Sequence, residues 1–108
     1  MMYIDFAANG KQYKLRLNTR QVIVLEKQLA CNPLTIFGAG DTIPTVTTMV
    51  NILHCALQQY QHNITLNDAY DIFDEWLADG NTATDFLPVI IEIYKVSGLI
   101  KNDTEVKN

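Results

Sequence analysis

Asn9-Gly10 lies between two short runs in which apolar and polar side chains alternate, and this pattern predicts a β-hairpin with a two-residue type I′ turn. Cross-strand partners then have positions that sum to nineteen. This register places six apolar groups on one face, in the pairs Met2–Leu17, Ile4–Leu15 and Phe6–Tyr13. The other face pairs Asp5 with Lys14. Two strands alone are marginal in water, so we expect the apolar face of a hairpin over residues 2–17 to cover helices.

Apolar residues at helical spacing predict four helices after the hairpin, over about 20–30, 45–61, 66–79 and 84–97. Thr19 is expected to cap the first helix, and Asn32-Pro33 to stop it. Pro44 and Thr45 open the second. Thr65 with Asp68 has the spacing of a capping box for the third, and Gly98 is the expected left-handed stop of the fourth.

The second and third helices each have an apolar stripe that predicts a buried face. The stripe of the second consists of Val46, Met49, Val50, Leu53, Ala56, Leu57 and Tyr60. The stripe of the third consists of Leu66, Ala69, Tyr70, Phe73, Trp76 and Leu77. The fourth helix is apolar almost all round, so it is either the centre of the bundle or half of an interface.

These elements predict a mainly α fold of the α+β class, in which an N-terminal β-hairpin packs on about four α-helices. Residues 1–100 are expected to form a single domain, because the chain has 108 residues and no linker or internal repeat is visible. Residues 101–108 have little to bury and are expected to form a flexible C-terminal tail.

Composition indicates a folded chain: 48% of its residues are apolar and 19% are charged. The formal net charge of −4 opposes a phosphate backbone, so nucleic acid is not an expected partner. The most apolar segment, residues 86–96, is too short to cross a bilayer, and no secretory signal is visible, so we expect neither a membrane partner nor export. The two cysteines, Cys31 and Cys55, are expected to be reduced thiols.

No catalytic or metal-binding constellation emerges from the sequence, so we expect a protein that is not an enzyme and has no cofactor. The third helix carries an acidic face of Asp68, Asp71, Glu75 and Asp79, with Asp74 nearby. A solvated face is the favoured interpretation, ahead of complementarity to a basic partner and of a metal-dependent enzyme. His54, Cys55 and His62 lack the spacing of a helical zinc pair.

Apolar side chains exceed what a four-helix layer plainly needs, chiefly in the last helix and in the segment from Leu34 to Phe37. One interpretation is a tightly filled core. The other is a groove that receives an apolar helix from a partner.

The chain resembles the tail assembly chaperones of long-tailed (siphovirus-type) phages and prophages of Gram-positive bacteria. The resemblance runs from about Tyr3 to Ile100. It is carried by NGKQYKLRLNTRQVIVLEKQLACNPLTIF, IPTVTTMVNILHCALQQY, LNDAYDIFDEWLADG and IIEIYKVSGLI. It implies a protein of the host bacterial cytoplasm that keeps the helical, aggregation-prone tape measure protein soluble. It also implies that the protein promotes polymerisation of tail tube subunits around the tape measure and is absent from the finished virion.

The same family often makes a longer form of the chaperone by ribosomal frameshifting, and such a form is a further possible partner. Ile100-Lys101-Asn102 and Val106-Lys107-Asn108 are both compatible with a slippery heptamer, which the nucleotide sequence tests directly. Self-association is also open, given the apolar hairpin face and the apolar last helix.

The partner is expected to bind the last helix and the surface beside it. The predicted contact residues are Ile91, Ile93, Tyr94 and Val96, with Ile36 and Phe37 next. The alternative function is a small cytosolic adaptor or antitoxin-like regulator that binds one partner protein. Flanking genes for a tail tube protein and a tape measure protein distinguish the two.

Overall fold

The structure is a computed structural model that describes residues 2–37 and 43–101. In these ranges a two-stranded antiparallel hairpin precedes four α-helices, which confirms the predicted α+β class. The strands are β1 (Ile4–Ala8) and β2 (Lys11–Leu15). The helices are α1 (Thr19–Leu29), α2 (Val46–Ala56), α3 (Leu66–Ala78) and α4 (Phe86–Val96). Short 3-10 turns at Pro33–Thr35 (η1) and Ala83–Asp85 (η2) precede α2 and α4.

The hairpin has the predicted register, with Ile4 opposite Leu15 and Phe6 opposite Tyr13. Asn9 and Gly10 both have positive φ, at 52° and 77°, as the type I′ turn requires. The ladder stops before the expected Met2–Leu17 pair, and Met2 is 60% exposed whereas Leu17 is buried. The apolar face of the paired strands is thus shorter by one cross-strand pair than predicted.

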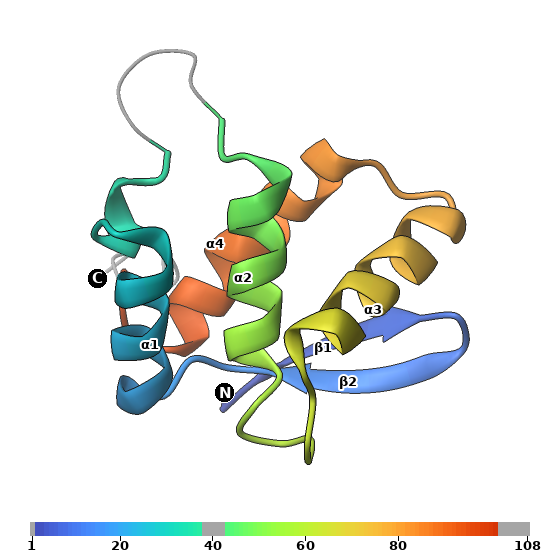
Figure 1. The fold of residues 1–108 in the computed structure, drawn as a ribbon, viewed down its shortest axis with the longest axis horizontal. Helices are drawn as coiled ribbons and strands as arrows, with labels where there is room; N and C mark the ends of the chain where they lie inside the picture. The colour runs from blue at the N-terminus through green and yellow to red at the C-terminus, as the bar shows by residue number, and fades with distance from the viewer. Residues whose placement is uncertain (1, 38–42, 102–108) are drawn as a thin grey trace, which may run out of the picture.

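The second helix forms the centre of the fold, with α1 on one side, α3 on the other and α4 behind it (Figure 1). Six of the eleven residues of α2 are buried. In α4 the buried residues are Phe86, Ile90, Ile93 and Tyr94, whereas Ile91 and Glu92 are exposed. The last helix is therefore a core helix with one solvent-facing side, and the central position belongs to α2.

Hydrogen bonds between distant segments fix the hairpin to the helices. The backbone N–H of Arg16 donates to the carbonyl of Ala56 at 3.0 Å, and its guanidinium donates to the carbonyl of Val96 at 2.7 Å. At the other end of the hairpin, the N–H of Asn9 donates to the Asp79 carboxylate at 2.9 Å. Both ends of the hairpin are thus held against helix termini.

Helix limits follow local capping chemistry, with two differences from prediction. Asn18 caps α1, where its side chain accepts from the N–H of Gln21 at 2.9 Å, so the prediction of Thr19 as the cap is wrong. The predicted second helix over 45–61 ends at Ala56. The capping box of Thr65 and Asp68 is confirmed, as is the positive φ of Gly98 after α4.

The described helices include none that is long and apolar enough to cross a membrane. Of the predicted tail over 101–108, residues 102–108 lie outside the described residues.

Candidate functional site

The structure places two of the predicted contact residues in the core. Ile93 is 0% exposed and Tyr94 is 2% exposed. The hydroxyl of Tyr94 donates to the carbonyl of Pro33 at 2.8 Å, which ties α4 to η1. The prediction that these two residues contact a partner is therefore wrong, because no partner reaches a side chain enclosed by its own fold.

The other four predicted residues keep some exposure. Ile91 is 37% exposed on α4. Val96 is half-buried, and Ile36 and Phe37 are half-buried against the core. None of the three surface depressions described below is lined by any of the six predicted residues.

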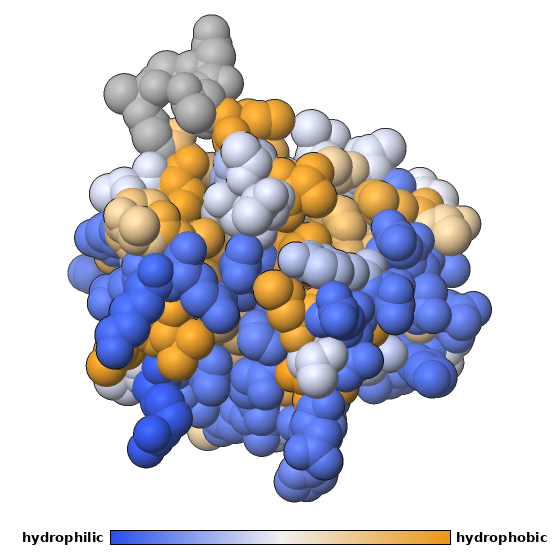
Figure 2. Space-filling view, in the orientation of Figure 1, coloured by the Kyte–Doolittle hydropathy of each residue, from blue (hydrophilic) through white to orange (hydrophobic). Residues whose placement is uncertain are grey.

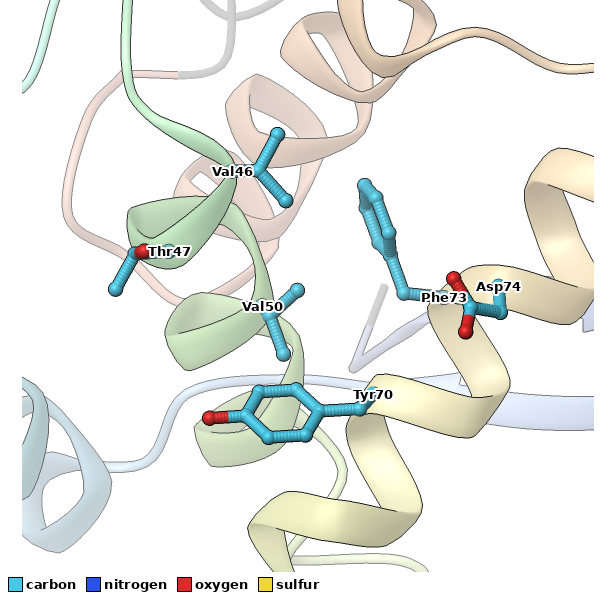
Figure 3. A pocket seen from close by; sticks show the side chains of 6 residues that line it. All are labelled: Val46, Thr47, Val50, Tyr70, Phe73 and Asp74. Carbon is cyan, nitrogen blue, oxygen red and sulfur yellow. The ribbon is translucent and has the colours of Figure 1, made fainter.

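An open groove lies between α2 and α3, with a cavity volume of about 390 Å³ (Figure 3). Its lining comes from one turn of each helix and consists of Val46, Thr47, Val50, Tyr70, Phe73 and Asp74. We call this the α2–α3 groove. The spacing of i and i+4 on α2, and of i, i+3 and i+4 on α3, brings these side chains onto facing surfaces.

The α2–α3 groove has a buried floor and exposed walls. Val50 and Phe73 are 4% and 3% exposed and form the floor. Val46 and Tyr70 are 51% and 48% exposed and form the walls. Figure 3 shows the side chains of Val46 and Phe73 pointing toward each other and the Tyr70 ring lying beside Val50. An apolar helix side chain can enter such a site and bury the surface that both walls leave in water.

The rim of the α2–α3 groove carries one acid, Asp74. Within residues 2–37 and 43–101, no hydrogen bond or ion pair engages its carboxylate. The neighbouring acids Asp68 and Asp71 line a different cleft, on the hairpin side of α3. The acidic residues of α3 are thus divided between two surfaces, and Asp74 is the one at the apolar groove.

The hairpin-side cleft of α3 has a volume of about 380 Å³ and a polar lining that includes Lys11, Tyr13, His62, Asp68, Asp71 and Glu75. Hydrogen bonds from the backbone and side chain of Thr65 lower the pKa of Asp68, in keeping with its helix-capping role. Burial and the nearby charge of Glu75 raise the pKa of Tyr13. The part of the chain that the structure describes contains no group of three or more His, Cys, Asp or Glu residues that could hold a metal ion.

The outer side of α1 carries a third surface, with a depression of about 560 Å³ lined by Thr19, Arg20, Ile23, Val24 and Lys27. We call this exposed face of the helix the α1 ridge. Ile23 at its centre is 47% exposed, and both cations are exposed. Figure 2 shows apolar surface over α1 beside strongly hydrophilic side chains, on the same face of the molecule as α2 and α3.

The α2–α3 groove escaped sequence reasoning because its two exposed walls belong to the predicted buried stripes. Val46 is the first residue of α2 and is 51% exposed. Tyr70 belongs to the predicted buried stripe of α3 but is about half exposed. Ile72 lies outside that stripe and is buried. The available signal was the polar tip of tyrosine, which favours a boundary position over a dry core.

Comparison with known proteins finds a matching family model, and the description of that family assigns no function. A family model matches residues 7–107, and its description is a family of unknown function, DUF6096. No curated protein and no solved structure gives a significant match.

Proposed function

The chain belongs to the DUF6096 family of unknown function, and on that premise we propose that it is a non-enzymatic tail assembly chaperone of a phage or prophage. It binds a helical segment of the tape measure protein, which we call the client, and keeps it soluble in the host bacterial cytoplasm. Tail tube subunits and a frameshifted long form are further partners under this proposal.

One observation carries the proposal: the α2–α3 groove has valine and aromatic side chains in its floor and walls, and it is open and unfilled by the described residues of its own chain. Val46 and Tyr70 leave about half of their surface in water although a buried floor lies between them. Grooves of this kind bind amphipathic helices through apolar side chains spaced at i, i+3 or i+4. The resemblance to tail assembly chaperones supplies a partner of that kind, since it implies a long helical client.

The charge of the groove defines the client further. Asp74 is a rim carboxylate without a hydrogen bond or ion pair to the residues that the structure describes, and the whole chain has a net charge of −4. A client helix with a Lys or Arg one turn from its apolar anchor would place its cation near Asp74. We therefore expect the bound segments of the tape measure protein to be apolar on one stripe and basic beside it.

The test is co-expression of the full chain with a tape measure fragment, scored by the amount of soluble fragment that co-purifies. The groove variant combines Val46→Asp with Tyr70→Ala. Both positions are about half exposed, and an acid in the first turn of a helix is favourable, so the fold should persist. We expect the groove variant to lose co-purification while its circular dichroism stays unchanged.

Ile91→Asp is the matched control, because Ile91 is an exposed apolar residue on α4 away from the groove lining. It should retain the fragment. Loss of binding in Ile91→Asp alone would move the site to α4, and equal binding by every variant and the parent would refute the proposed groove. A tape measure fragment that stays insoluble with the parent chain would refute the function itself.

A further inference from the structure

The α1 ridge and the α2–α3 groove are complementary in charge. The ridge presents a half-exposed Ile23 between Arg20 and Lys27. In the described part of the chain, neither cation has a hydrogen bond or an ion pair. The ridge is thus an amphipathic helix face with an apolar centre and basic flanks, which is the pattern that the groove favours.

The groove offers the matching features in the same order. Its apolar walls, Val46 and Tyr70, stand on either side of a buried floor, and the unpaired carboxylate of Asp74 lies one turn from Tyr70. Ile23 fits between the walls as an anchor, and one of its flanking cations then reaches the acid. The ridge from residue 20 to residue 27 spans roughly 10 Å, which exceeds the roughly 6 Å of one groove wall, so its charges fall at the rim.

Helices α1 and α3 lie on opposite sides of α2 (Figure 1). The ridge belongs to the helix on one side of α2, and the groove opens on the other side. A two-fold axis parallel to α2 and outside the molecule exchanges the two sides. It sets the ridge of each copy over the groove of the other, so that both contacts form together.

We propose that two copies of this chain form a reciprocal dimer in which the α1 ridge of each closes the α2–α3 groove of the other. The two half-exposed walls lose their contact with water in each of two identical contacts, and each acid gains a cation. The dimer masks the groove when no client is present. The masking role rests on the proposed function, because it needs a client. Dimer formation does not, because it is measured on the chain alone.

The experiment is sedimentation equilibrium on the full chain, over a concentration series that reaches the near-millimolar range. We expect a monomer–dimer equilibrium. Ile23→Asp should weaken the dimer roughly a hundredfold, because the two-fold axis removes each anchor contact twice. Ile23 is about half exposed, so the substitution should leave the circular dichroism unchanged.

Charge reversal provides a variant set that does not depend on the apolar anchor. Asp74→Lys should weaken the dimer about tenfold, and so should Arg20→Glu combined with Lys27→Glu. Joining the reversed ridge with Asp74→Lys should recover most of the loss. Asp71→Lys is the matched control, since it lies on the same helix but lines the hairpin-side cleft, and it should have no effect.

Three results overturn the dimer: a monomer at every concentration, a dimer insensitive to both Ile23→Asp and Asp74→Lys, or a mass that grows beyond two copies. A monomer that still solubilises the tape measure fragment leaves the function standing and removes only the masking. A dimer that behaves as expected but never binds the fragment leaves the interface standing and removes the function.

Discussion

Ile91 and Ile93 lie two positions apart on α4 and have opposite environments. Consecutive residues of an α-helix turn by about 100°, so these two point to nearly opposite sides. Ile93 is fully buried against the other helices, whereas Ile91 is 37% exposed. A sequence of apolar residues alone does not distinguish them, because both carry the same side chain.

We expect Ile93→Ala to lower the free energy of unfolding by about 2–5 kcal/mol, because it leaves a cavity in a closed core. Ile91→Ala is the matched variant with the same change in chemistry, and it should alter stability by less than about 1 kcal/mol. Urea titrations followed by circular dichroism measure both. Equal losses would contradict the placement of Ile93 in the core.

Cys55 makes the stability of the fold sensitive to alkaline pH. Burial raises the pKa of its thiol from 9.0 to about 11. Above pH 9 the unfolded chain releases this proton while the folded chain keeps it, so stability is full below pH 9 and falls as the pH rises toward 11. Burial, and after it the charge of Cys31, raises the pKa of Tyr94 as well, in the same direction.

Urea titrations over this pH range should show a loss of about 2–3 kcal/mol from Cys55. Cys55→Ala should be less stable at neutral pH but should lose less stability on the alkaline side. An identical alkaline decline in parent and variant would show that Cys55 is not the group responsible. Tyr94 then remains as the buried group to test.

At the scale of the element, the parts that sequence predicts well are those set by neighbours in the chain. The hairpin register follows from Asn9-Gly10, and the start of α3 follows from Thr65 and Asp68, because each depends on residues within a few positions. The end of α2 at Ala56 was missed, and it coincides with a long-range bond, from Arg16 N–H to the Ala56 carbonyl. No local pattern encodes such a bond.

The groove was out of reach of sequence reasoning for a related reason. An apolar stripe predicts that a helix face avoids water, but the distance between two helices decides which members of the stripe are covered. Val46 and Tyr70 were both assigned to stripes and are both about half exposed, because α2 and α3 do not close over them. Exposed apolar side chains therefore occur between α2 and α3 as well as in the two predicted segments, where Leu34 is 45% and Ile91 is 37% exposed.

Asn18 and Thr19 provide a direct test of element boundaries. Asn18 accepts the N–H of Gln21 at 2.9 Å, whereas Thr19 is the first residue of α1 and makes no capping bond. Asn18→Ala should therefore cost about 1 kcal/mol of unfolding free energy, and Thr19→Ala only a few tenths. Thermal or urea unfolding of the two variants checks this. A larger loss of unfolding free energy in Thr19→Ala than in Asn18→Ala would show that Thr19 is the capping residue.

At the scale of the whole molecule, the two proposals give one groove two occupants, and this would link client binding to self-association. A dimer with both grooves closed cannot bind the client until it dissociates. The apparent affinity for the client is therefore the intrinsic affinity multiplied by the fraction of grooves that are free. By reciprocity, client that occupies the grooves would shift the protein toward monomers.

Ile23→Ala separates this linkage from ordinary binding, because Ile23 lies outside the groove lining and the change adds no charge. At chaperone concentrations above the dimer dissociation constant, the variant should bind a labelled tape measure fragment more tightly than the parent does. Far below that constant, the two should bind it equally. Fluorescence anisotropy at two fixed chaperone concentrations, with unlabelled fragment as competitor, measures both cases. Weaker binding by Ile23→Ala at either concentration would mean that the ridge itself contacts the client. The proposed competition between client and ridge for the groove would then be wrong.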